Sequence, residues 1–277
     1  MKKKSIVIIA AVLMMACVCC LGACTRNNDK VTYFTYADAD KYSANVNEYM
    51  DYVSEVNVNW ISGSVTVTTG NVRAVTIEET YSKDKVSDDY KVHSYLENGK
   101  LNIAFAKSGK FVGSINLKKD LTVTFPQEME LKTVVVRSVS AKVELKNSVT
   151  VTDFRAETVS ADVKAAFSVN SPVNFKVKTV SGFVDGTFLS SAAPFIDIET
   201  VSGKAQIDAL DLTDVDFSSV AGDLTVFIPD GVGYKATLDS VAGKVNSEFD
   251  GKTVYGDGRV KIDAKTTTGN VEIKIKK

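Results

Sequence analysis

A short phrase returns along most of this chain: a hydroxyl residue, an aliphatic residue and a second small or hydroxyl residue precede glycine or alanine. From position 141 to position 269 its small fourth residue recurs at steps of 20, 21, 21, 19, 21 and 26, with an early variant near position 63. A step this regular is a repeat period, and periods in this range are typical of solenoids and arrays. The small residues are Gly63, Ala141, Ala161, Gly182, Gly203, Gly222, Gly243 and Gly269.

Before each phrase, apolar residues alternate with polar ones, as in Val134 and Val136 or Phe154 and Ala156. Period-two alternation predicts strands whose apolar side chains face inward and stack coil upon coil. The small residue suits a sharp corner or a positive φ, and the hydroxyls before it can bond backbone groups that the corner leaves unpaired. The sequence therefore predicts an all-β protein, a single-domain β-solenoid with repeats of about 20 residues over 53–277.

Two segments near the start depart from this period. Residues 72–125 contain alternating runs on either side of Asn98-Gly99, which predicts an antiparallel hairpin region inserted into the first coils. Residues 39–53 carry apolar residues at helical spacing, among them Tyr42 and Tyr49, which predicts an amphipathic helix that caps the open end of the solenoid. Exposed tyrosines here could instead stack on sugar rings.

The first residues predict export. Three lysines and an apolar run lead to Leu21-Gly22-Ala23-Cys24, which resembles the lipobox of bacterial lipoproteins. We expect residues 1–23 to be a signal peptide, Cys24 to carry lipid, and residues 24–52 to form a tether with the capping helix. An ordinary secretory peptide or an uncleaved anchor is the alternative. Two acyl chains would hold the protein on the extracytoplasmic face of the cell membrane.

Charge and cysteine content narrow the function. The formal net charge is -1, and loss of the three signal lysines brings it to -4, with no basic stripe, so nucleic acid is excluded as a partner. Cleavage leaves Cys24 as the single cysteine, which excludes an intramolecular disulfide or a cysteine zinc site. His93 is the single histidine, so we expect no metal site built from histidines and no serine-histidine-aspartate triad.

Stacked coils would bring two columns of charged residues together, one before and one after each corner. Opposite charges would lie beside one another in most of both columns, which predicts ion-pair ladders that fix the register and form a candidate binding face. The first column contains Arg137, Glu157, Lys178 and Glu199, followed by Ser218, Asp239 and Lys265; the second contains Asp162, Lys204, Asp223 and Lys244.

Other chemistry has weaker support. Glu157 and Glu199 could form an inverting carboxylate pair, but Lys178 between them opposes the raised pKa that a general acid needs. Asp208, Asp211, Asp214 and Asp216 are the best calcium candidates, yet their spacing matches no calcium loop. No phosphate-cradling glycine loop is present, so we predict no catalytic residue, metal or cofactor.

The phrases together resemble a known family. Leu121-Thr-Val-Thr-Phe-Pro126, Lys132-Thr-Val-Val-Val-Arg-Ser-Val-Ser-Ala141, the repeated Thr-Val-Ser-Gly and the closing Thr267-Thr-Gly-Asn-Val-Glu-Ile273 resemble the bacterial putative adhesin family over residues 53–277. Ala141 and Ala161 depart from the usual glycine. The resemblance implies an extracytoplasmic, non-enzymatic β-solenoid and brings no catalytic residues.

The leading hypothesis is therefore a non-catalytic, lipid-anchored binding protein whose partner is a cell-wall glycan, or an envelope or host surface protein. A second hypothesis is an accessory lipoprotein in envelope-stress sensing. A third is a glycan-cleaving enzyme.

Overall fold

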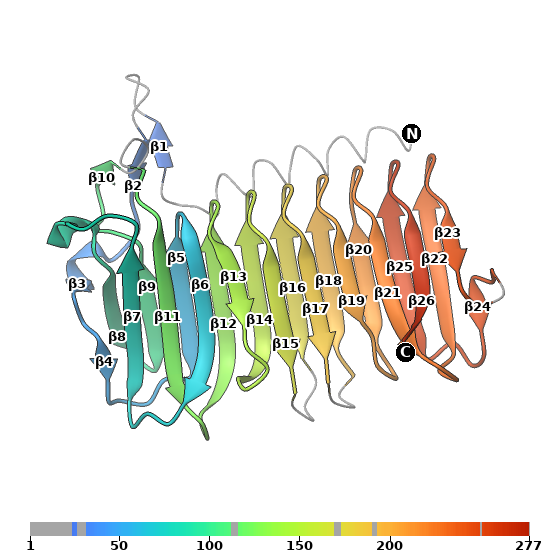
Figure 1. Ribbon diagram of the computed structural model, residues 1–277, viewed down its shortest axis with the longest axis horizontal. Helices are drawn as coiled ribbons and strands as arrows, with labels where there is room; N and C mark the ends of the chain where they lie inside the picture. Colours follow the sequence, from blue (N-terminus) through green and yellow to red (C-terminus); the bar gives the residue numbers. More distant parts are fainter. Residues whose placement is uncertain are drawn as a thin grey trace.

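The computed structural model describes residues 24–26, 32–111, 116–168, 173–189, 193–249 and 251–276. Two long sheets, of twelve and eleven strands, lie face to face along the molecule, and a three-stranded sheet lies at one end (Figure 1). The predicted signal peptide lies outside the described residues. Within the described ranges, no helix has the length and apolar character needed to cross a bilayer.

Each central coil gives one strand to either sheet, and the repeated phrase forms the corner between them. Neighbouring coils pair in parallel, so that Val134, Phe154 and Phe175 occupy equivalent positions in successive strands. This architecture confirms the predicted β-solenoid. The strands are β12 (Glu130–Ser138), β13 (Lys142–Leu145), β14 (Thr150–Thr158), β15 (Val163–Phe167), β16 (Asn174–Thr179), β17 (Val184–Phe188), β18 (Phe195–Thr200), β19 (Ala205–Asp208), β20 (Asp214–Ser218) and β21 (Leu224–Pro229).

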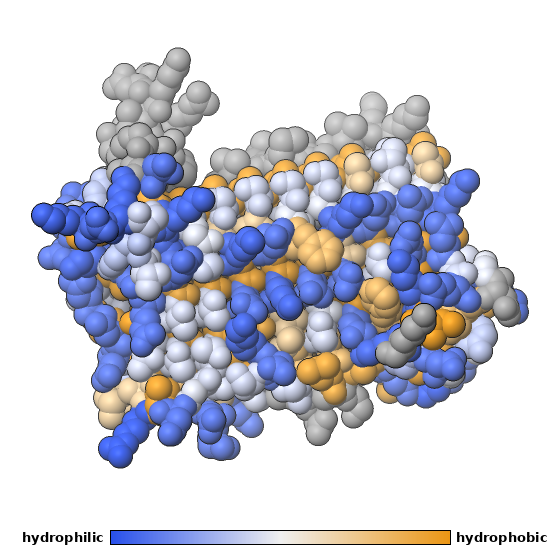
Figure 2. Space-filling view, viewed as in Figure 1, coloured by the Kyte–Doolittle hydropathy of each residue, from blue (hydrophilic) through white to orange (hydrophobic). Residues whose placement is uncertain are grey.

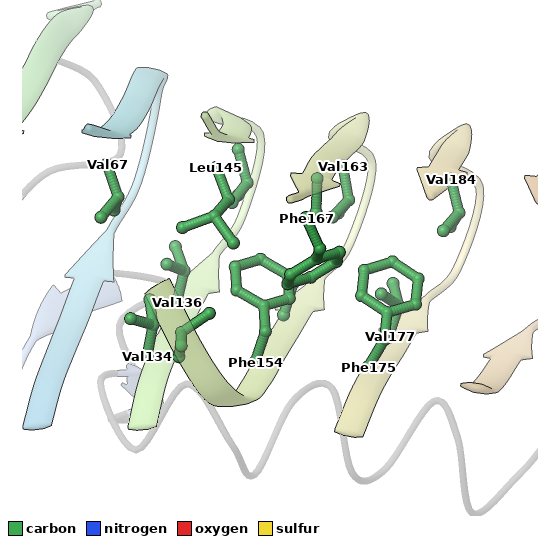
Figure 3. Close-up of a cluster of buried hydrophobic side chains, with 14 of the residues drawn as sticks. Val67, Val134, Val136, Leu145, Phe154, Val163, Phe167, Phe175, Val177 and Val184 are labelled. Carbon is green, nitrogen blue, oxygen red and sulfur yellow. The ribbon is translucent and has the colours of Figure 1, made fainter. Parts of the chain in front are cut away.

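The core is a continuous apolar layer between the two sheets. Alternate residues of each strand are buried, as the sequence predicted. Phe154 stacks on Phe175 with ring centroids 5.8 Å apart, and Phe167 stacks on Phe188 at 5.0 Å. Edge-to-face contacts join the two stacks across the sheets, as between Phe154 and Phe167 (Figure 3). Stacking of phenylalanines at equivalent positions of neighbouring strands therefore reinforces the pairing register that the backbone hydrogen bonds set.

The coils do not follow one another in chain order at either end. The coil of β5 (Glu55–Trp60) and β6 (Gly63–Gly70) lies between the β12–β13 coil and a later one, formed by β9 (Lys100–Ala104) and β11 (Lys119–Pro126). At the other end, β25 (Val260–Thr266) and β26 (Val271–Lys276) lie between the β20–β21 coil and the coil of β22 (Tyr234–Ser240) and β23 (Val245–Ser247). The C-terminus consequently lies inside the row of coils (Figure 1).

Antiparallel strands cover the N-terminal end. β7 (Val75–Tyr81) pairs with β11, and β8 (His93–Glu97) pairs with β9 through a turn in which Asn98 and Gly99 have φ of 52° and 75°. The hairpin at Asn98-Gly99 is confirmed, but β9 and β11 run parallel to the solenoid strands, so residues 72–125 form an end coil and its cover rather than an antiparallel insertion. A 3-10 turn, η2 (Asp88–Tyr90), joins β7 to β8.

The predicted capping helix is wrong. The segment forms a 3-10 turn, η1 (Ala39–Lys41), and two short strands, β3 (Ser43–Ala44) and β4 (Glu48–Tyr49). β3 pairs with β8 and β4 pairs with β7, because the free N–H and C=O groups of those edge strands need extended partners. The half-buried Tyr42 and Tyr49 pack against the core from this extended chain.

The remaining short strands lie at the two ends. The three-stranded sheet is antiparallel, so part of the predicted tether is paired. It consists of β1 (Cys24–Arg26), β2 (Thr32–Phe34) and β10 (Lys110–Phe111). At the opposite end β24 (Val254–Tyr255) pairs antiparallel with the first two residues of β22.

Candidate functional site

The repeated corner is a structural device. At most corners the hydroxyl of the first residue accepts a hydrogen bond from the N–H of the small residue three positions later, as from Ala141 to Ser138 at 2.8 Å. A Cβ added at Gly222 would collide with the carbonyl oxygen of Gly203 in the neighbouring coil, so close approach of the coils explains the glycine. Gly63, with φ of 102°, combines such a contact with a left-handed backbone. Equivalent hydroxyl bonds are made at Gly182, Gly203, Gly222, Gly243 and Gly269.

The first charged column runs along the outer face of the twelve-stranded sheet. Arg137, Glu157, Lys178 and Glu199 are directly paired in register on successive strands. Arg137 lies 3.3 Å from Glu157, and Lys178 lies 2.9 Å from Glu199. Each carboxylate thus has a cation beside it, whereas a general acid is kept protonated by an apolar setting. The geometry gives no support to a Glu157–Glu199 catalytic pair.

The second column, after the corners, is less regular. Lys204 lies 3.4 Å from Asp223, whereas Asp162 accepts a hydrogen bond from the backbone N–H of Phe183 at 3.0 Å. Phe183 is 40% exposed, so an apolar ring interrupts the charges of this column. On the face shown in Figure 2, hydrophilic and hydrophobic residues form interleaved rows along the molecule.

The inserted last coil changes the order of both columns. Ser218 pairs with Lys265, which in turn pairs with Asp239. The predicted order of this column, in which Asp239 follows Ser218, is therefore wrong at this end. In the second column, the backbone N–H of Lys244 donates to the side chain of Asn270 at 3.1 Å.

The aspartates considered for calcium do not converge. Asp208 belongs to the eleven-stranded sheet and lies 2.9 Å from Lys276, while Asp214 belongs to the other sheet. Asp211 pairs with Arg259 at 2.6 Å. Across the described ranges, no group of three or more histidine, cysteine or acidic residues is arranged to hold a metal ion.

Another acidic row lies on the twelve-stranded sheet. Asp197, Asp216 and Asp263 are paired in register on three adjacent strands. Burial raises the pKa of the Asp216 carboxyl, and the charges of Asp263 and Asp197 raise it further. Like charges in register are destabilising, so this row is a cost to the fold.

A groove of about 520 Å³ lies at the N-terminal end of the same sheet. Its floor is the outer face of β5 and β9, and the chain segment before β3 forms one wall. The aromatic and amide residues among those that line it are Tyr36, Tyr42, Tyr95, Asn57, Asn59, Asn98 and Asn102. Asn57 donates to Asn102 at 3.2 Å and accepts from Arg137 at 2.8 Å, so the amide floor adjoins the first charged column.

Three tyrosines form the wall of this groove. The ring centroids of Tyr36 and Tyr42 lie 4.4 Å apart, and those of Tyr42 and Tyr95 lie 4.5 Å apart. The Tyr36 hydroxyl donates to the carbonyl of Ala106 at 3.0 Å and accepts from the N–H of Ser108 at 3.1 Å, which holds the wall in place. Burial raises the pKa of Tyr36 to about 12, against the weaker effect of the Ser108 hydrogen bond.

A family model described as Toastrack DUF4097 matches residues 53–277. The chain belongs to the Toastrack DUF4097 family. The matched range has the same bounds as the repeat domain predicted from the sequence, and it includes β5, β9 and the amide floor of the groove.

Solved structures similar to this Toastrack chain have low sequence identity. One is a putative cell adhesion protein from Clostridium sporogenes, 14% identical, with a TM-score of 0.30, covering 85% of this chain and 98% of that one. Another is a putative adhesin from Bacteroides fragilis, 13% identical, with a TM-score of 0.41, covering 84% and 97%. No curated protein matches the chain.

Sequence reasoning did not find the groove of this Toastrack protein. Its residues come from segments far apart in the chain, and Tyr95 reaches Tyr42 only because β8 folds back on β9. Two signals were present: Tyr42 of the wall is among the tyrosines considered above for stacking on sugar rings, and Asn57 and Asn59 occupy the outward positions of a strand whose inward positions are Val56 and Val58. His93, in contrast, is buried, and its Nδ1 donates to the carbonyl of Lys91 at 2.9 Å.

Proposed function

We propose that this Toastrack protein is a lipid-anchored, extracytoplasmic binding module that holds a surface ligand without transforming it. One observation carries the proposal: the outer face of the twelve-stranded sheet presents its side chains in straight, register-locked columns from β9 to β22, and most of them are charged or amide, with Val135 and Ser218 among the exceptions. A rigid face with a repeated spacing suits a ligand that itself repeats, such as a wall glycan or an extended surface protein.

The ladder of Arg137, Glu157, Lys178 and Glu199 offers a test that leaves net charge unchanged. The quadruple variant Arg137→Glu, Glu157→Lys, Lys178→Glu and Glu199→Lys reverses every charge while keeping opposite charges adjacent. Retention of the full chain on purified cell-wall and envelope material would be compared between this variant and the wild type, with product release measured in the same assay.

Saturable retention without product, lost in the quadruple variant, is the expected result. Retention that survives the reversal would remove this ladder from the binding face, and release of shortened glycan would replace binding with catalysis. Selective capture of one membrane protein would favour the envelope-stress role over adhesion. The urea midpoint of the variant serves as the control for folding.

The anchor is a separate part of the proposal. The lipobox-like sequence that ends at Cys24 supports lipidation, and β1 begins at this residue. Mass spectrometry of the mature N-terminal peptide tests it directly. A diacylglyceryl group on Cys24 and release of Cys24→Ser from the membrane fraction are expected, whereas an unmodified, soluble wild-type chain would refute the anchor.

A further inference from the structure

The groove between the chain segment before β3 and the strands β5, β8 and β9 combines aromatic rings with side-chain amides. We propose that it binds a short neutral oligosaccharide, with its sugar rings against the tyrosine wall and their hydroxyls on the asparagine floor. This inference rests on the function proposed above and assigns it a ligand class and a place on the molecule. The groove volume of about 520 Å³ falls in the usual range for small-molecule sites.

The amide floor matches the chemistry of a hydroxyl group. A side-chain amide both donates and accepts hydrogen bonds, as a sugar hydroxyl does. The amide of Asn57 is fixed between Arg137 and Asn102, and Asn102 also donates to the carbonyl of Lys100 at 3.2 Å. These contacts orient the floor before a ligand arrives, which lowers the entropic cost of binding.

Asn59 supplies the free polar group of the floor. It points outward from β5 beside these fixed amides, and its side chain makes no hydrogen bond within the described part of the chain. Its donor and acceptor are therefore available to a ligand. A ligand without hydroxyls would leave them unpaired, which disfavours purely apolar molecules.

The tyrosine wall supplies flat apolar surface. Tyr42 and Tyr95 are half-buried and line the groove, and among the described residues neither hydroxyl makes a hydrogen bond. Tyrosine presents a large rigid area with a polar tip at a low entropic cost. An aromatic ring beside free hydroxyls and amides is complementary to a sugar ring, which has apolar C–H faces and a polar rim.

The charges around the groove select against acidic sugars. Asp38, Glu55 and Glu97 line it, whereas Lys100 is the one cation among its lining residues. Lys41 lies 2.8 Å from Glu97 and neutralises that carboxylate. The balance that remains is negative, so an anionic glycan would be repelled while a neutral one would not.

The sheet edge argues against an extended peptide as the ligand. β9 is paired on both sides, with β8 and β5, and β5 is paired with β9 and β12. Strand addition needs a free edge with unpaired N–H and C=O groups. This groove offers side chains only, which fits recognition of hydroxyl groups.

The test is a titration of the full chain, in detergent solution, with oligosaccharide probes. Binding is monitored by the NMR signals of the asparagine side-chain amides. The neutral probes are chitotetraose, cellotetraose and maltotetraose, and the acidic probe is tetragalacturonate. Asn59→Ala and Tyr95→Ala alter the groove. Asn246→Ala, on β23, and the exposed Tyr52→Ala are the matched controls outside it.

We expect at least one neutral tetrasaccharide to shift the amides of Asn57, Asn59 and Asn102. Both groove variants should weaken this binding about ten-fold or more, and both controls should stay within about two-fold. Absence of binding by all three neutral probes, equal binding of tetragalacturonate, or unchanged binding in both groove variants would overturn the inference. If these variants bind the tetrasaccharides as the wild type does and are still retained on cell-wall material, the groove assignment fails while the binding function stands; if the wild type is not retained at all, the binding function fails.

Discussion

The ammonium group of Lys119 lies 2.9 Å from the carboxylate of Glu79, and both side chains are closed to solvent. Lys119 also donates to the carbonyls of Tyr90 and Phe105 and lies over the ring of Trp60 at 4.7 Å from its centroid. Glu79 in turn accepts the N–H of Val92 at 2.6 Å. This pair therefore joins β7, β11 and the loop before β8 into one end cap.

Stability should depend on the protonation of this lysine. Burial lowers the pKa of Lys119 to about 8, although Glu79 opposes the shift, whereas the unfolded chain keeps the ordinary value of 10.5. Between these values the unfolded state binds more protons, so the free energy of unfolding rises with pH. We expect a gain on the order of 2 kcal/mol from pH 8 to 10 in urea unfolding.

The pH prediction has an upper limit and a control variant. Above pH 10 the trend should reverse, because burial raises the pKa of Tyr36 to about 12 and the folded state then holds the extra proton. The double variant Lys119→Met, Glu79→Gln removes both charges and still offers a side-chain amide oxygen at position 79 to the N–H of Val92. The rise between pH 8 and 10 should disappear in this variant; if it persists, another group is responsible.

The corner glycines should tolerate no added methyl group. In Gly222→Ala the new Cβ would collide with the carbonyl of Gly203, which belongs to the rigid backbone of the next coil. We expect a loss of about 1–3 kcal/mol in the free energy of unfolding. Gly70→Ala is the control, since its Cβ would meet only a methyl group of Thr124, at 2.9 Å. Equal urea midpoints for the two variants would contradict the close-approach explanation.

Removing the middle charge of the acidic row Asp197, Asp216 and Asp263 should reduce the repulsion between its carboxylates. The pKa of Asp216 is raised in the folded protein. Ionisation of this carboxyl at neutral pH therefore lowers the free energy of unfolding, and protonation restores it. Asp216→Asn should raise the free energy of unfolding at pH 7 by about 0.2 to 1 kcal/mol; the gain is small because the carboxyl is only partly buried and solvent screens its charge. The gain should vanish below the pKa of the carboxyl and shrink in high salt. A loss of stability at pH 7 would show that the charge is useful to the fold.

The repeat, its two sheets and its buried positions could be predicted from the sequence because each depends on local pattern. Alternation determines which face of a strand is buried, and the corner phrase determines where the chain turns. The order of the coils could not be predicted in the same way. The phrases ending at Gly222, Gly243 and Gly269 are nearly equivalent, so each could stack on either of the others.

The discriminating signal was the length of a connection. The step from Gly243 to Gly269 is 26 residues, five more than the preceding step, and the additional chain lets β25 return past β22. The groove could not be predicted from the sequence for a related reason. Its wall depends on Tyr42 meeting Tyr95, which follows from strand pairing at the cap and leaves no periodic trace in the sequence.

The inserted last coil makes an unusual prediction for truncation. Deleting residues 258–277 removes β25 and β26 from the interior of the row and leaves β22 and β23 without their parallel partners. Deleting residues 231–277 removes both coils and ends the chain just after β21. Ala236, which is buried in the untruncated chain and pairs with Ile262, would remain without this neighbour only in the shorter deletion.

We therefore expect the chain that lacks more residues to be the more stable of the two. Urea midpoints and the onset of aggregation on heating measure the difference, with the complete chain as reference. If the β22–β23 coil can instead dock directly on the β20–β21 coil, the shorter deletion will have the higher midpoint. That result would mean that the corner phrases alone determine stacking, and that the inserted order depends on the presence of the last coil.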